Sequence, residues 1–241
     1  MNFDTKFLIR WGIPGWVFII FIGSMILFEN YSNISQITNG IGTALGLLVS
    51  LGFFGVTLGY LMHQVYFSFN WTNKKKKSYR IIDDAVLMIR ESEKIKNYKN
   101  HTWGRDYHED YYLFEFQWHK ELLNQEPDKR DYITDRYRHL LSTIHALGAL
   151  KISLYSSLIF NVVMLVISIN PNGKVSDYFI PFIIIGLNVY LTYVSHKGFE
   201  YYSSNLNHFQ GYFLDSFYEE KATNTSNENG STNENTIEST D

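Results

Sequence analysis

The sequence predicts an all-α polytopic membrane protein, with four transmembrane helices and helical cytoplasmic extensions that form a bundle. Four mostly apolar runs of at least 18 residues contain no Asp, Glu, Lys or Arg, and one segment between the second and third runs holds most of the charge. The mean hydropathy of -0.16 and the hydrophobic content of 45% would suit a soluble protein. The uneven distribution of the apolar residues excludes a purely soluble domain.

The composition also excludes several classes of site. The chain has no cysteine, which rules out disulfides, thiolate metal sites, cysteine nucleophiles and cysteine lipidation. The net charge of -3 gives no bulk basicity, so nucleic acid is not an expected partner. The sequence has no phosphate-binding loop, dinucleotide fingerprint, HExxH motif or nucleophile elbow, so we expect no cofactor and no enzyme activity of these kinds.

The first apolar run, residues 11–28, is predicted to be a transmembrane helix. At about 1.5 Å per residue it covers roughly 27 Å, close to a hydrocarbon core of about 30 Å. Lys6 and Arg10 precede it, which would also suit a signal peptide. The run is long for a signal peptide, lacks a small-x-small cleavage site and is followed by Glu29, so we interpret it as the first span.

The other three runs complete two transmembrane hairpins. The second run, residues 41–69, is long enough to tilt, and His63 is its only residue that titrates near neutral pH. The third and fourth runs, residues 152–169 and 178–195, are near the minimum spanning length. The chain is thus divided into a transmembrane hairpin (residues 1–72), a cytoplasmic helical region (73–151), a second transmembrane hairpin (152–196), a cytoplasmic helix (197–221) and a disordered acidic tail (222–241).

Lysine and arginine predict the orientation. Of 21 such residues, 16 lie in residues 74–151, whereas the link 29–40 has none and the link 170–177 has one. By the positive-inside rule, the central segment and both termini are cytoplasmic and the protein is a multi-pass protein of the cell inner (plasma) membrane. A basic run directly after the second span is also a candidate site for anionic lipid headgroups. Its members are Lys74, Lys75, Lys76 and Lys77.

Residues 78–150 are predicted to form three cytoplasmic helices. The second of these carries an apolar stripe with Tyr111, Phe114 and Trp118 at helical spacing, which we expect to be a surface for cytoplasmic interactions. No helix breaker separates the third helix from the third span. Residues 130–169 are therefore expected to form one helix of roughly 60 Å.

The end of the chain is predicted to be helical first and disordered afterwards. The fourth span runs on toward Tyr218 without a strong breaker. Residues 222–241 are mostly Asn, Ser, Thr and Glu, and they have too little apolar surface to offset the entropy lost on ordering.

Small residues are frequent in the second span. Gly42 and Gly46 form one GxxxG pattern, and Gly55 and Gly59 form another. Gly52 joins the second pair on one side of the helix, more than about 90° from the first pair at 100° per residue. Glycine allows helices to approach closely, so the pattern predicts helix packing, either in an oligomer that lines a pore or within the chain.

Three polar residues lie at membrane depth. His63, near the cytoplasmic end of the second span, is a candidate gate or proton-sensitive site, or an interfacial histidine bonded to a neighbouring carbonyl. Asn161 and Asn188 lie at mid-depth in the third and fourth spans. They are expected to hydrogen-bond across helices or to line a polar path.

Arg138 and His145 lie on one face of the predicted third cytoplasmic helix. The stretch Arg-His-Leu-Leu-Ser-Thr-Ile-His resembles the arginine–histidine motif of HEPN ribonucleases over eight residues. The resemblance implies RNA cleavage across a dimer, with the histidine near the scissile phosphate. It makes these two residues catalytic candidates, in a membrane-tethered ribonuclease.

Glu115 and His119 are the candidate ligands for a metal site. They lie at i and i+4 on a polar stripe of the second cytoplasmic helix and would hold a divalent metal with help from another helix. A solvated face or a subunit contact is the alternative interpretation. We therefore predict no metal.

The function predicted from the sequence is an oligomeric channel or pore controlled from the cytoplasmic side by a protein or small-molecule signal. The order of spans and cytoplasmic segment resembles the broad plan of bestrophin channels, and the size and topology resemble small bacterial effectors of stress and phage defence. The bias toward Asn, Lys and Ile is typical of an AT-rich bacterium. The alternatives are the HEPN-like ribonuclease and a non-enzymatic scaffold that recruits a cytoplasmic partner.

Overall fold

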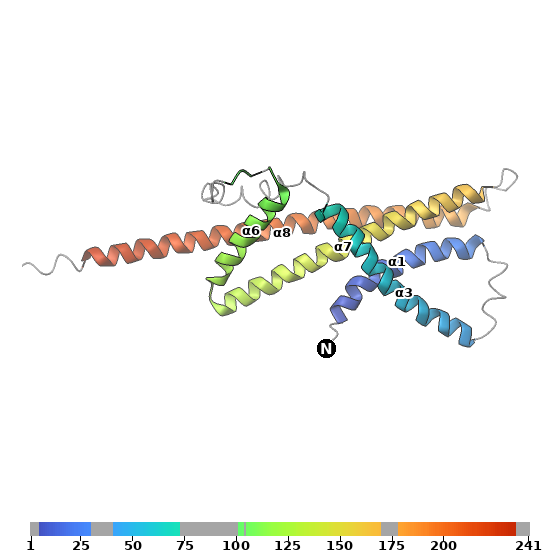
Figure 1. The fold of residues 1–241 in the computed structure, drawn as a ribbon, viewed down its shortest axis with the longest axis horizontal. Helices are drawn as coiled ribbons and strands as arrows, with labels where there is room; N and C mark the ends of the chain where they lie inside the picture. The colour runs from blue at the N-terminus through green and yellow to red at the C-terminus, as the bar shows by residue number, and fades with distance from the viewer. Residues whose placement is uncertain (1–4, 30–40, 73–100, 104, 170–177, 235–241) are drawn as a thin grey trace, which may run out of the picture. The chain divides into compact units, whose positions relative to one another are not determined.

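The described part of the chain is helical. The computed structural model describes residues 5–29, 41–72, 101–103, 105–169 and 178–234, and these contain five α-helices, one π-helical turn and no strand (Figure 1). The all-α class is therefore confirmed for the described residues. The lysine run and the predicted first cytoplasmic helix lie outside them.

The helices, in chain order, are α1 (Thr5–Glu29), α3 (Ile41–Phe67), the π-helical turn η1 (Ser68–Thr72), α6 (Tyr107–Leu123), α7 (Pro127–Ser168) and α8 (Phe179–Glu234). Within α1, α7 and α8 lie stretches that are long and apolar enough to cross a membrane. These three helices are consistent with a membrane protein. The second predicted span, which corresponds to α3, stays a prediction, as do the total of four spans and the bundle.

The described residues divide into two compact units. The first contains α1, α3, η1, the part of α7 from Leu141 onward and the part of α8 up to Tyr202. The second contains α6, the beginning of α7 and the part of α8 from Ser203 onward. Both α7 and α8 thus contribute residues to each unit.

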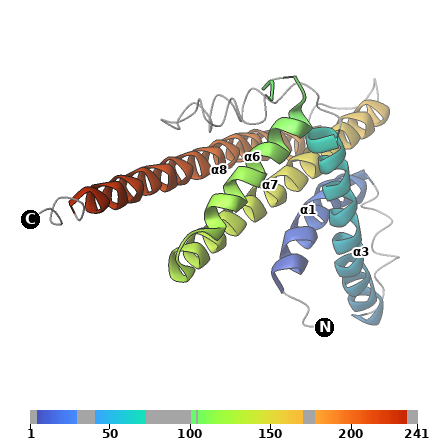
Figure 2. The same cartoon turned by 60° about the vertical axis from the view of Figure 1, so that its left-hand side comes forward.

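The first helix begins earlier than its apolar run. Because α1 starts at Thr5, Pro14 lies inside the helix and not in its first turn. A proline at such a position removes a backbone hydrogen bond and is a usual cause of a bend. Figures 1 and 2 both show α1 as a bent helix.

The long helix α7 confirms the continuous helix expected from the absence of breakers. Pro127 is its first residue, where a missing N–H removes no intrahelical bond. The other long helix, α8, extends to Glu234 and so enters the segment predicted to be disordered. Elongating an existing helix needs no new nucleus, which the composition of that segment does not reveal.

The second unit has an aromatic core. Asp106 caps α6, because its side chain accepts from the backbone N–H groups of His108 (2.8 Å) and Glu109 (3.4 Å). The core gathers the apolar stripes of α6, early α7 and late α8. Its buried members are Phe114, Trp118, Leu122, Ile133, Leu214 and Phe217.

Candidate functional site

A seam of polar side chains is buried between α7 and α8 in the first unit. Ser153, Ser157 and Asn161 follow one another at i, i+4 and i+8 on α7, and all three are fully buried. They cover about 12 Å of the helix axis. Asn188 and Thr192 on α8 are also buried. We call these five residues the polar seam.

Asn188 joins the two helices. Its amide nitrogen donates to the carbonyl of Leu154 at 3.1 Å, and its oxygen accepts from the Ser157 hydroxyl at 2.9 Å. Thr192 donates to the backbone oxygen of Asn188 at 2.7 Å. The seam therefore holds α7 and α8 together by hydrogen bonds in a region where apolar side chains surround it.

Asn161 behaves differently. It is 0% exposed, and within the described part of the chain neither its amide nitrogen nor its amide oxygen has a hydrogen-bond partner. The hydroxyl of Ser153, two turns away, is in the same condition. A buried amide without partners costs about 1–3 kcal/mol, so the position of Asn161 suits water, which can donate to the oxygen and accept from the nitrogen.

Glycine backbones form the crossing of α1 and α3. A Cβ atom on Gly15 would lie 2.6 Å from the nitrogen of Gly59 and would overlap the carbonyl oxygen of Gly55. A Cβ atom on Gly59 would overlap the carbonyl oxygen of Trp11. The ring of Trp16 covers Gly55, and its Nε1 donates to the oxygen of Gly52 at 3.2 Å. Of the predicted face of Gly52, Gly55 and Gly59, the last two thus pack closely within the chain, whereas a Cβ atom on Gly52 would meet nothing within 4 Å.

The other glycine face of α3 has no such neighbour in the described part of the chain. A Cβ atom on Gly46 would meet nothing within 4 Å, and Gly46 is exposed. The surroundings of Gly42 lie outside the described side chains. Sequence reasoning identified both faces of α3, but it did not identify Gly15, because a glycine in the first turns of a span has no repeated pattern to mark it.

His63 lies in an aromatic cluster of the first unit. Its ring is 4.8 Å from that of Phe67 and 5.9 Å from that of His145, measured between centroids. Tyr66 packs against His145 at 5.9 Å and covers Gly148 so closely that a Cβ atom there would lie 2.5 Å from its Cδ2. Both histidines are buried. The cluster connects the end of α3 with α7.

This placement bears on the HEPN-like pair. The ring of His145 is 8% exposed and stacks on Phe67 at 4.9 Å, whereas Arg138 is exposed. A histidine that cleaves RNA must reach the scissile phosphate. Burial of His145 among aromatic rings does not suit that role.

The apolar stripe of α6 that was predicted to be an interaction surface lies in the core of the second unit. Phe114 is 2% and Trp118 is 0% exposed, and Tyr111 packs against the same core. The stripe therefore fills the second unit instead of facing a partner. The large apolar side chains that α6 exposes are Tyr112, Phe116 and Leu123.

Glu115 is an acceptor for neighbouring helices. It accepts from the hydroxyl of Tyr137 at 3.1 Å and from Nε2 of Gln210 at 3.0 Å, and Nδ1 of His119 lies 3.6 Å away. Burial, together with the charge of Glu115, holds the pKa of Tyr137 above its ordinary value, so that the phenol stays a donor. No group of three His, Cys, Asp or Glu that could hold a metal exists among the described residues.

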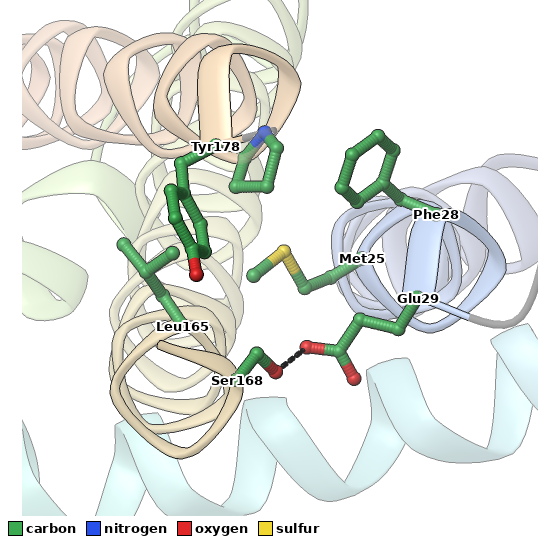
Figure 3. Close-up of a pocket in the computed structure, with 7 residues that line it drawn as sticks. Met25, Phe28, Glu29, Leu165, Ser168 and Tyr178 are labelled. Carbon is green, nitrogen blue, oxygen red and sulfur yellow. Dashed lines mark hydrogen bonds between the residues drawn. The ribbon is translucent and has the colours of Figure 1, made fainter. Parts of the chain in front are cut away.

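A pocket of about 600 Å³ opens at the end of the first unit where α1 and α7 end and α8 begins. Figure 3 shows Met25, Phe28 and Glu29 of α1 on one side of it. Leu165 and Ser168 of α7 and Tyr178 before α8 face them. The hydroxyl of Ser168 donates to Glu29 (Figure 3). Sequence reasoning treated Glu29 only as the end of a span.

Comparison of the chain with protein families, curated proteins and solved structures finds no match.

Proposed function

We propose that this protein is a homo-oligomeric membrane channel or pore that is controlled from the cytoplasmic side. The observation that carries the proposal is the polar seam. It lies in α7 and α8, two of the helices that are long and apolar enough to cross a membrane. Polar side chains at membrane depth are costly, and where they occur they often mark pathways for ions, protons or water.

The buried amide of Asn161 is the part of the seam that suits conduction. Hydrogen bonds between helices explain Asn188 and Ser157, but they do not explain a fully buried amide that has no partner among the described residues. Water molecules at Asn161 and Ser153 would satisfy these groups and extend the seam into a hydrated path. Such a path suits protons or small hydrated ions.

In this proposal α3 crosses the membrane together with α1, α7 and α8. The glycine crossing holds α3 against α1 along a face without side chains. The remaining surface of α3 exposes Phe53, Phe54 and Leu61, which suits lipid or a second copy of the chain. Gly46 leaves room there for a close neighbour.

Control from the cytoplasm would act through α7 and α8. Each helix contributes to both units, so a signal that changes the packing of the second unit would bias the seam through continuous helices. The nature of the signal and a role in bacterial defence stay predictions from the sequence.

The test is ion and proton flux into liposomes that contain the purified full-length chain. We expect flux with the wild type, and at least a tenfold lower flux with Asn161→Leu, which replaces the amide by an apolar side chain with the same number of heavy atoms. Ser24→Ala is the matched control, because Ser24 is a hydroxyl in α1 that bonds only to its own helix in the described structure. Ser24→Ala should conduct as the wild type does.

Two outcomes would contradict the proposal. Absence of current under every condition, together with a monomeric mass in detergent, would exclude a homo-oligomeric channel. Undiminished flux with Asn161→Leu would show that conduction does not pass the seam.

A further inference from the structure

The pocket shown in Figure 3 combines an apolar interior with one charged group. Met25 is fully buried beneath it, and Leu165 and Pro181 complete its apolar lining. Its volume of about 600 Å³ lies within the range of about 300–1,000 Å³ that is typical of small-molecule sites. The space can therefore hold a short alkyl chain together with a headgroup.

The charge of the pocket is negative. Glu29 and Glu200 are the only carboxylates among the described residues of the first unit, and Glu29 is the one that lines the pocket. None of the seven lining residues is a lysine or an arginine. Among the described residues, the Ser168 hydroxyl donates to one oxygen of Glu29, which leaves the other oxygen available to a cation.

Aromatic rings extend the preference for a cation. Phe28 and Tyr178 line the pocket together with the carboxylate (Figure 3). The face of an aromatic ring attracts an ammonium group, and aromatic side chains are the usual means of binding quaternary ammonium ligands. A carboxylate with two aromatic rings discriminates against anions and neutral alcohols.

We propose that this pocket binds the ammonium group of a cationic amphiphile, with its alkyl chain against Met25 and Leu165. Two kinds of ligand carry such an ammonium group, namely an amine-bearing phospholipid and a soluble alkylamine. The predicted orientation of the chain places this end of the helices on the outer side of the membrane. The proposal is independent of conduction and is tested by binding alone.

The test uses the full-length protein in nanodiscs of phosphatidylglycerol, which has no ammonium group. Octyltrimethylammonium is titrated by calorimetry, and octanol serves as the uncharged comparison. We expect saturable binding of the ammonium compound and at least tenfold weaker binding of octanol. Partition of the probe into lipid is measured with empty nanodiscs and subtracted.

Two matched variants identify the charge. Glu29→Gln keeps the shape of the side chain and should weaken binding about tenfold. Glu200→Gln removes the other carboxylate among the described residues of the unit, which pairs with Lys197 outside the pocket, and should leave binding unchanged. Phe28→Leu should weaken binding about threefold without any change of charge, which separates the aromatic contribution.

A second membrane composition distinguishes the sources of the ammonium group. Where half of the lipid is replaced by phosphatidylethanolamine, a shifted titration in the wild type but not in Glu29→Gln assigns the site to the lipid headgroup. An unchanged titration assigns it to a soluble amine. Superimposable titrations of wild type and Glu29→Gln, or octanol binding as tight as that of the ammonium compound, would overturn the proposal.

Discussion

The crossing of α1 and α3 predicts that Gly59→Ala destabilises the protein. A Cβ atom on Gly59 would overlap the carbonyl oxygen of Trp11 and lie 2.7 Å from its carbonyl carbon and 3.0 Å from the nitrogen of Gly15. All three atoms belong to the backbone. No rotamer change can relieve the overlap, so the two helices must separate.

The size of the effect follows from this separation. Restoring an ordinary contact of about 3.5 Å between this Cβ atom and the Trp11 carbonyl oxygen requires a shift of roughly 2 Å, which forfeits at least half of the dispersion energy along the crossing. Overpacking of this kind costs about 1–3 kcal/mol. In a membrane, close packing is a main source of helix association, so we expect the loss to appear in full.

Gly46→Ala is the matched control on the same helix. A Cβ atom there would meet nothing within 4 Å. Both substitutions gain up to about 1 kcal/mol of helix propensity, which cancels when the two variants are compared. The difference of about 1–3 kcal/mol between them therefore measures the overlap at the crossing.

The assay is unfolding of the full-length protein in mixed micelles, followed by tryptophan fluorescence. Trp11 and Trp16 lie at the crossing, so their emission reports its separation. We expect Gly59→Ala to unfold at a lower denaturant concentration than the wild type, and Gly46→Ala at the same or a higher one. Equal unfolding of the two variants would refute the reasoning.

Three further predictions concern buried polar groups. Asn161→Leu should leave stability unchanged or raise it by up to about 1 kcal/mol in the same assay, because the amide makes no hydrogen bond to another helix in the described structure, and lower stability would count against this account. The raised pKa of Tyr137 means that its neutral form stabilises the fold below the ordinary value of 10.0, and that this contribution is lost above it. The stability advantage of wild type over Tyr137→Phe should therefore shrink between about pH 8 and 11, and a constant difference in melting temperature would contradict it. Glu121→Gln, which removes a buried carboxylate whose partner Lys221 is exposed, should cost about 1–3 kcal/mol. Glu220→Gln, at a pair in which neither side chain is buried, should cost less than about 0.5 kcal/mol, and equal effects would show that burial of the carboxylate is irrelevant.

Helix continuity and the core of the second unit were predictable because they depend on local pattern. The absence of breakers from residues 130–169 predicted most of α7. The spacing of Tyr111, Phe114 and Trp118 marks one apolar face of α6, and in the structure this face packs in the core of the second unit. The same pattern cannot say whether an apolar stripe meets a core or a partner, because both remove it from water. The expected interaction surface was for this reason misplaced.

The glycine face and the polar seam show where such reasoning stops. Gly55 and Gly59 are recognisable by their spacing. Their partner Gly15 belongs to no such spacing pattern, because the point at which two helices cross depends on the angle between them. Asn161 and Asn188 are both polar residues at mid-span, and sequence gives them the same two roles. Their difference arises from neighbours, since Asn188 faces Leu154 and the Ser157 hydroxyl, whereas no partner faces Asn161 in the described structure. Asn161 makes no hydrogen bond that holds the helices together in the described structure. We therefore expect its replacement to lower conduction without lowering stability.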